Sequence, residues 1–285
     1  MHAQQARTLS VCADDFGLTP GISGAITRLA RAQCITAISC ITSSPYWESS
    51  APLLGHVPES VDVGLHINLT EGRPLSPQLA QIWPRLPALP VLIPRAHLGL
   101  LPLAALASEV KAQLAAFRAA TGSWPRYLDG HQHVHHLPGL RDIVLEMAAR
   151  MLPTAAIRNT GRVLGPGSDV KRWLIENTGG QALTRDLARR GLTHNPVLLG
   201  AYNFQDLDYR GRMQGWLAAL PAEGGLLFCH PGELVGGDPT DAIAAARARE
   251  LAYLESDAFV QDRATANVTL GRVWRDARTP PLLDR

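Results

Sequence analysis

The stretch TLSVCADDFG, residues 8–17, joins a short apolar run to an acidic pair. Residues 8–13 are rich in apolar and β-branched side chains and predict a strand. Asp14 and Asp15 follow at its end, and residues 22–33 then carry apolar side chains at helical spacing. The chain therefore begins with a strand, a polar strand end and a helix, the unit from which parallel α/β sheets are built.

The same unit repeats along the chain. Further strands are predicted at residues 35–42, 61–69, 125–131, 155–158, 197–199, 225–229 and 268–270. Helices are predicted at residues 103–121, 140–151, 206–220 and 241–254, with one or two more around Lys171 and residues 181–190. The Pro-rich residues 73–102 predict a long loop or lid instead, because proline lacks the backbone N–H that a regular element needs. Alternating strands and helices predict an α/β fold with a parallel sheet.

Size and composition narrow the class of protein. A chain of 285 residues is long enough for one α/β domain, and its 46% hydrophobic and 18% charged residues are typical of soluble globular proteins. The net charge of +2 comes from interspersed signs, so we expect no nucleic-acid partner. No apolar stretch is long enough to span a bilayer. The N-terminus lacks the apolar core of a secretory signal, so a cytoplasmic location is expected.

Polar side chains stand at the ends of four predicted strands. Asp14 and Asp15, His66, His131 and His230 all lie at or near the carboxyl end of a strand. Because these ends meet at one edge of a parallel sheet, we expect the side chains to gather there. Two imidazoles and one carboxylate, with open positions, suit a metal that activates water. The alternatives are helix capping by the aspartates and a buried structural role for a lone histidine such as His66.

Four of the ten histidines fall in DGHQHVHH, residues 129–136. Asp129, His131, His133 and His135 recur with period two, so on an extended strand they would share one face. Such a row is costly to bury without partners, and it predicts a metal or proton-transfer site. The alternative is a solvated polar loop or a set of hydrogen-bonded structural histidines.

Four motifs taken together resemble the YdjC-like carbohydrate deacetylases: ADDFGL (13–18), GLHINLTEG (64–72), DGHQHVH (129–135) and CHPG (229–232). They occur in the family's order, although the family often has Ser where this chain has Gly130. The resemblance implies a distorted, TIM-barrel-like (β/α) barrel with its active site at the strand C-terminal ends. It also implies hydrolysis of an N-acetyl group from an amino sugar or a chitooligosaccharide-like substrate, with release of acetate.

The resemblance also suggests roles for individual residues. The family's metal-binding histidines correspond to His66 and His131, its ligating carboxylate to Asp15 and its base to Asp14. The expected cofactor is one divalent ion, magnesium or zinc. We expect His230 to donate a proton to the departing amine.

The remaining polar residues are expected around these ligands. Asp129 and His133 would orient the ligands through hydrogen bonds. His135 and Glu71 would orient ligands or bind the substrate, and His135 and His136 would line the substrate mouth. Substrate choice is expected to depend on the Pro-rich loop and on residues 159–209, both within one catalytic domain that spans residues 1–285.

Two other functions remain open. Metal hydrolases of amidohydrolase and phosphoesterase type also use a His-x-His pair, but usually on the first strand. A non-catalytic protein that binds a sugar or stores a metal would bind its ligand without releasing acetate. The expected partner is a small carbohydrate substrate, and the resemblance is compatible with a homodimer.

Overall fold

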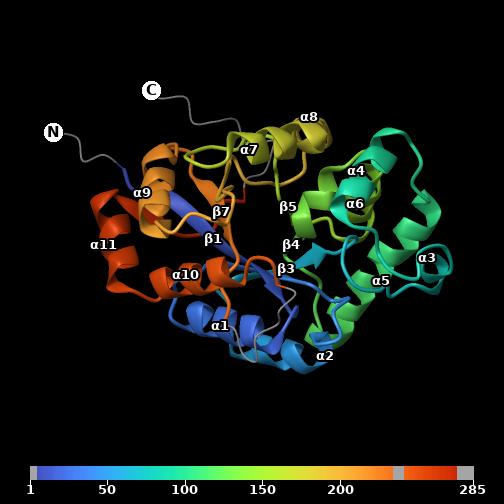
Figure 1. The fold of residues 1–285 in the computed structure, drawn as a ribbon, viewed down its shortest axis with the longest axis horizontal. Helices are drawn as coiled ribbons and strands as arrows, with labels where there is room; N and C mark the ends of the chain where they lie inside the picture. Colours follow the sequence, from blue (N-terminus) through green and yellow to red (C-terminus); the bar gives the residue numbers. More distant parts are fainter. Residues whose placement is uncertain (1–4, 234–240, 275–285) are drawn as a thin grey trace.

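The computed structural model describes residues 5–233 and 241–274, which are arranged around one parallel sheet (Figure 1). Its strands are β1 (Arg7–Phe16), β2 (Ala37–Cys40), β3 (Asp62–Ile67), β4 (Tyr127–Gly130), β5 (Ala156–Ile157), β6 (Leu198–Leu199), β7 (Gly225–Cys229) and β8 (Val268–Leu270). The strand order is β5-β4-β3-β2-β1-β7-β6, and β8 pairs with the start of β1. The predicted α/β fold with a parallel sheet is confirmed.

The two ends of this sheet come together. Beyond β5, Ile157 forms an isolated parallel bridge with His194, and Val163 forms one with Leu198 in β6. Single bridges therefore join the edges where a regular barrel would have a full ladder of hydrogen bonds. This incomplete closure matches the distorted barrel that the family resemblance implies.

The helices cover the sheet (Figure 1). They are α1 (Pro20–Arg31), α2 (Trp47–Ser50), α3 (Pro77–Ile82), α4 (Leu89–His97), α5 (Leu103–Thr121), α6 (Leu140–Met151), α7 (Asp169–Ile175), α8 (Gln181–Arg190), α9 (Tyr209–Ala219), α10 (Ala244–Leu254) and α11 (Asp257–Thr265). Short helical turns occur at η1 (Ala51–His56), η2 (His131–His136) and η3 (Glu176–Gly180). Among the described residues, no helix is both long enough and apolar enough to cross a bilayer.

The Pro-rich residues 73–102 are not the irregular loop that their composition predicts. They contain α3 and α4, each with a proline in its first turn, where the missing N–H is not needed. Ser76 caps α3 through its side chain, and its own backbone N–H donates to Glu109 of α5 at 2.7 Å. Pro94 lies inside α4. The loop prediction is wrong because tertiary contacts and the position of each proline outweigh the count of prolines.

Strand β1 is longer than predicted and runs through the middle of the sheet. It is buried from Leu9 to Phe16, with β7 on one side and β2 and β8 on the other. The acidic pair, Asp14 and Asp15, therefore lies within the buried carboxyl end of the strand. This places two carboxylates at the buried carboxyl end of a strand that has neighbours on both sides.

Candidate active site

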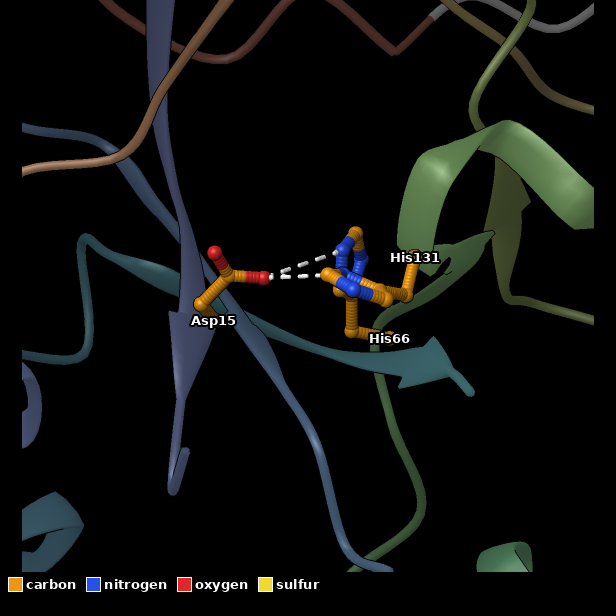
Figure 2. A group of neighbouring side chains, drawn as sticks. All are labelled: Asp15, His66 and His131. Carbon is orange, nitrogen blue, oxygen red and sulfur yellow. Dashed lines mark hydrogen bonds and ion pairs between the residues drawn. The ribbon is translucent and has the colours of Figure 1, made fainter. Parts of the chain in front are cut away.

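Three possible metal ligands meet at the carboxyl ends of β1, β3 and β4 (Figure 2). Asp15 Oδ1 lies 3.1 Å from His131 Nδ1 and 3.6 Å from His66 Nε2. One ligand atom from each residue lies within 4.8 Å of the others. All three side chains are buried. The structure thus brings together the three residues that the family resemblance places on the metal.

The backbone explains how two adjacent aspartates reach one site. Neighbouring residues of a regular strand face opposite sides. Asp15 instead has a φ of 72°, and the pairing of β1 with β2 shifts between Ala13 and Phe16. As a result His66 Nε2 lies 3.6 Å from Asp15 and 4.0 Å from Asp14. A left-handed conformation costs about 1–2 kcal/mol in a non-glycine residue, so this bulge is local strain at the site.

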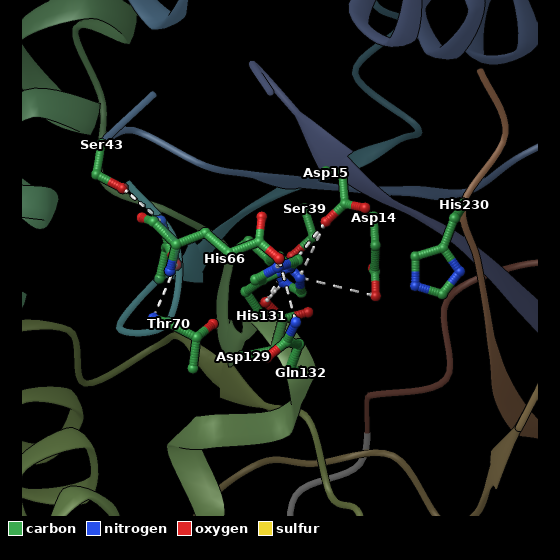
Figure 3. Close-up of polar contacts among 12 residues, drawn as sticks. Asp14, Asp15, Ser39, Ser43, His66, Thr70, Asp129, His131, Gln132 and His230 are labelled. Atoms are coloured by element: carbon green, nitrogen blue, oxygen red, sulfur yellow. Dashed lines mark hydrogen bonds and ion pairs between the residues drawn. The ribbon is translucent and has the colours of Figure 1, made fainter. Parts of the chain in front are cut away.

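Asp129 forms a hydrogen bond with Nδ1 of His66, the ring nitrogen that faces away from Asp15. His66 Nδ1 donates to Asp129 Oδ1 at 2.7 Å, and Ser39 Oγ donates to the same oxygen at 2.5 Å (Figure 3). Burial raises the pKa of Asp129, but the Arg158 guanidinium and His66 together hold it down to about 2. The ionised carboxylate therefore fixes the orientation of His66 and leaves Nε2 pointing at Asp15.

Arg158 binds the first aspartate and was not identified from the sequence. Its side chain is fully buried just after β5, and its Nη1 and Nη2 donate to the two oxygens of Asp14 at 2.7 and 2.6 Å. Nη2 also lies 2.5 Å from Asp129 Oδ2 and 3.0 Å from Cys12 Sγ. Cys12, Asp14 and Asp129 could by spacing hold an ion. We assign this group to the guanidinium, because Arg158 contacts all three.

Arg247 binds the second aspartate and was also missed. It lies on α10, where its Nη2 forms an ion pair with Asp15 Oδ2 at 2.9 Å and its Nε donates to Asp241 at 2.8 Å. Burial raises the pKa of Asp15, but Arg247 and His131 outweigh it and hold that pKa well below its usual value. No sequence signal marks this arginine among the others of an Ala-rich helix. Its ion pair occupies one oxygen of Asp15 and leaves the other facing the histidines.

His131 lies between two carboxylates. Its Nδ1 faces Asp15, and its Nε2 is 3.2 Å from Oε1 of the half-exposed Glu71, which also accepts from Gln132 Nε2 at 3.2 Å. Burial lowers the pKa of His131, but Asp15 and Glu71 raise it to about 10. A metal ion and a proton therefore compete for this imidazole.

The backbone of the histidine cluster overturns the period-two prediction. Strand β4 ends at Gly130, and η2 begins at His131. Gln132 and His133 have φ values of 53° and 62°, so the chain turns sharply. The alternating residues of the cluster do not share a strand face: Asp129, His131, His133 and His135. A Cβ at Gly130 would lie 2.8 Å from the His135 backbone nitrogen, which explains why glycine suits this turn.

The last two histidines of the cluster support the backbone around the site. His135 Nε2 donates to the Arg158 carbonyl oxygen at 2.9 Å, and the ring is fully buried away from the cavity. His136 hydrogen-bonds Thr160 through Nδ1 at 2.8 Å and Thr178 through Nε2 at 3.0 Å. The prediction that His135 lines the substrate mouth is wrong. It positions the strand end that carries Arg158.

A cavity of about 510 Å³ opens above these groups. Its polar floor contains Asp14, Asp15, His66 and His131. Its walls include Leu89 and Ile93 of α4, and Lys171, Leu174, Ile175 and Phe204 from the later part of the chain. Residues 73–102 and 159–209 therefore both line the cavity. Its volume is in the range of pockets that bind small molecules.

His230 lies on the wall of the cavity, directly after β7 (Figure 3). Its Nδ1 is buried without a hydrogen-bond partner in the part of the chain that the structure describes. The rings of Phe204 and Phe228 pack edge-on against it, at 5.2 and 5.6 Å between centroids. Burial lowers the pKa of His230 well below its usual value, and the positive charge of Arg247 adds to this although Asp15 opposes it. The imidazole is therefore neutral at pH 7.

Comparisons with known proteins show which family model and which proteins this chain matches. A family model described as YdjC-like protein matches residues 8–264. A carbohydrate deacetylase from Homo sapiens is 34% identical over 178 residues, which cover 58% of this chain and 51% of that protein. A chitooligosaccharide deacetylase from Enterobacter sp. (strain 638) is 33% identical over 153 residues, with coverages of 50% and 56%. The chain thus spans about half the length of these two curated relatives.

Two further comparisons extend over more of the chain. A chitooligosaccharide deacetylase from Proteus mirabilis (strain HI4320) is 29% identical over 235 residues, which cover 71% of this chain and 88% of that protein. A solved structure from Enterococcus faecalis V583, described as a candidate cellobiose-phosphate cleavage protein, superimposes with a TM-score of 0.73 at 19% identity. That superposition covers 94% of this chain and 98% of the other, and it shows a shared fold. Because the family model extends from β1 into α11, this chain belongs to the YdjC-like protein family.

Proposed function

We propose that this chain is a metal-dependent carbohydrate N-deacetylase, which removes the acetyl group from an amino sugar or a chitooligosaccharide-like substrate and releases acetate. The observation that carries the proposal is the convergence of Asp15, His66 and His131 on the floor of a 510 Å³ cavity. Family membership supports it, as do the names of the relatives, carbohydrate deacetylase and chitooligosaccharide deacetylase. Residues 73–102 and 159–209 would contact the sugar.

The donor set fits a divalent ion. Asp15, His66 and His131 offer one carboxylate and two imidazoles, which leaves positions open for water and for the acetamide oxygen. Each imidazole has a carboxylate near its other nitrogen, Asp129 for His66 and Glu71 for His131, as is usual for metal-binding histidines. An ion held here would lower the pKa of a bound water and stabilise charge on the acetamide oxygen. Imidazole ligands suit zinc, and carboxylate also suits magnesium.

Asp14 is the proposed base for the attacking water. Arg158 grips both of its oxygens, so the carboxylate has one fixed position, 4.0 Å from His66 Nε2. A base of fixed position beside the bound water shortens the path of the proton. Because both oxygens of Asp14 accept hydrogen bonds from Arg158, Asp14 would not compete with Asp15 for the ion.

His230 is the proposed donor to the departing amine. Because its imidazole is neutral before the reaction, the proton that it gives to the amine must first come from the attacking water, by way of Asp14. The hydroxyl of that water joins the acetyl carbon, the C–N bond breaks, and the amine receives the proton. One water and one acetamide are therefore converted into one acetic acid and one amine, so that atoms and charge balance.

Metal analysis and acetate release test this function. The purified protein should contain zinc or magnesium and should release acetate from N-acetylglucosamine oligomers, while a panel of phosphomonoesters run in parallel should not react. Replacing His131 with Ala should lower kcat/KM on the order of a thousandfold, because the bound ion would stabilise the charge of the transition state by several kcal/mol. The exposed His56 offers a matched control, since His56→Ala should change nothing. Undiminished acetate release by His131→Ala would contradict the proposal.

A further inference from the structure

The imidazole of His133 faces the cavity without a protein partner. The side chain is only 8% exposed, and its Nδ1 is buried with no hydrogen bond. Within residues 5–233 and 241–274, neither ring nitrogen has a hydrogen bond or an ion pair. The residue nevertheless lines the cavity. A buried polar group without a partner is unfavourable unless a ligand or water satisfies it.

The three neighbouring histidines of the cluster each have at least one hydrogen-bond or ion-pair partner, whereas His133 has none among the described residues. His131 faces Asp15 at 3.1 Å and belongs to the candidate metal ligands. His135 and His136 bind backbone and threonine groups. The expectation that His133 orients a ligand finds no support in its contacts, because its ring touches no acceptor of the metal site. Its position on the lining of the cavity allows contact with the substrate instead.

Packing fixes the direction of this ring. The Phe228 ring stands perpendicular to it, with centroids 5.0 Å apart and planes at 89°, and the His136 ring lies 6.2 Å away at 25°. Phe228 also contacts His230, the proposed proton donor, at 5.6 Å. His133 and His230 therefore flank one aromatic side chain on the same wall of the cavity. A sugar ring bound there would be within reach of both.

We propose that His133 is a positioning residue that hydrogen-bonds a hydroxyl group of the sugar ring whose acetamide is hydrolysed. This inference rests on the proposed deacetylase function and adds to it a recognition contact. A neutral imidazole offers one donor and one acceptor, and a hydroxyl can pair with either. The contact holds the ring relative to His230, so that the amine leaves next to its proton donor.

Two variants of His133 separate recognition from structure. His133→Phe keeps an aromatic ring and removes both nitrogens, whereas His133→Asn keeps a neutral donor and acceptor and tolerates the left-handed backbone. With N,N′-diacetylchitobiose, His133→Phe should raise KM about tenfold and leave kcat within about threefold of the parent value. His133→Asn should recover part of the loss. His56→Phe, at an exposed histidine, is the matched control.

Deoxy substrates identify the contact. Among substrates that each lack one ring hydroxyl, one should lose about tenfold in kcat/KM with the parent enzyme and lose nothing further with His133→Phe. Calorimetric titration with zinc should give the same affinity for both proteins. Equal kcat/KM in the parent and His133→Phe, or a loss of zinc affinity in that variant, would overturn the assignment. If the parent enzyme releases no acetate, the proposed function itself fails, which is a different result.

Discussion

Arg158 is the buried cation on which two active-site carboxylates depend, and its removal should be costly. Its side chain is fully buried and contacts both oxygens of Asp14 at 2.6–2.7 Å and one oxygen of Asp129 at 2.5 Å. Arg158→Met has a similar volume and no charge. The variant leaves two buried carboxylates without their shared partner. We therefore expect a large loss of stability together with a loss of activity.

The magnitude follows from the environment of the pair. Breaking a buried ion pair from one side costs about 3–5 kcal/mol, because the remaining charge stays uncompensated. Two carboxylates are affected here, so we expect a loss of about 4 kcal/mol or more. A domain typically has about 5–15 kcal/mol of stability, so the variant should still fold at room temperature. Adding Asp129→Asn removes one orphaned charge and should restore about 1–2 kcal/mol.

Urea denaturation followed by tryptophan fluorescence measures this loss at neutral pH. Arg150→Met is the control, because Arg150 forms an exposed helical pair with Glu146 at 2.8 Å that should contribute less than about 0.5 kcal/mol. The pH dependence gives an independent check. The pKa of Asp129 is held at about 2 by Arg158 and His66, so in the parent its contribution is lost only as pH falls toward that value.

In Arg158→Met, the pH dependence of the free energy of unfolding has the opposite sign. Without the guanidinium, burial raises the pKa of Asp129, so the variant gains stability as pH falls and this carboxyl group becomes protonated. The deficit relative to the parent should therefore shrink between about pH 7 and pH 4. A loss below about 1 kcal/mol, or a deficit that stays constant over this range, would refute the account of Arg158 as the shared counter-ion.

Three further predictions follow from other residues. Because the pKa of His131 is raised to about 10, metal must displace its proton, and apparent zinc affinity should rise about tenfold per pH unit between about pH 6 and 9; a flat titration curve would contradict this. Burial raises the pKa of Glu250 to about 7 against the hydrogen bonds that it accepts, so the parent loses about 3 kcal/mol of stability as pH rises from about 4.5 to 7. Glu250→Gln should remove that slope in urea denaturation, and an unchanged slope would count against it. A Cβ at Gly64 would collide with the buried Tyr127 ring, so Gly64→Ala should cost about 1–3 kcal/mol, whereas Gly24→Ala, with open space in α1, should stabilise by about 0.5–1 kcal/mol. Equal urea midpoints for the two alanine variants would show that the Tyr127 ring moves aside at little cost.

Local sequence patterns predict much of the fold. Helices α5 and α6 and strands β7 and β8 have the same bounds in the structure as in the prediction. The reason is that apolar periodicity and side-chain propensity act over a few residues and are visible in any window of the chain. The short α11 was not predicted. Its polar sequence has almost no amphipathic pattern, and it packs instead through single side chains such as the buried Phe259.

The sequence by itself also places the chemistry at the strand ends. Polar residues that end apolar strands predict a site at one edge of the sheet, because parallel strands bring those ends together. Only the family resemblance selects Asp15, His66 and His131 among these residues as the metal ligands. What these patterns cannot contain is the direction of a side chain after the strand ends, and the turn at His133 is the example.

Only the tertiary structure decided which charges surround the three proposed metal ligands. Arg158 lies 144 positions from Asp14 in the chain, and Arg247 reaches Asp15 from α10 near the other end. A single arginine forms no periodic pattern in the sequence. Its role depends on which carboxylate the folded chain brings within about 3 Å of its guanidinium. The same holds for the prolines of α3 and α4, whose effect depended on where each helix began. Short-range propensity determined the elements, and long-range packing determined the electrostatics of the site.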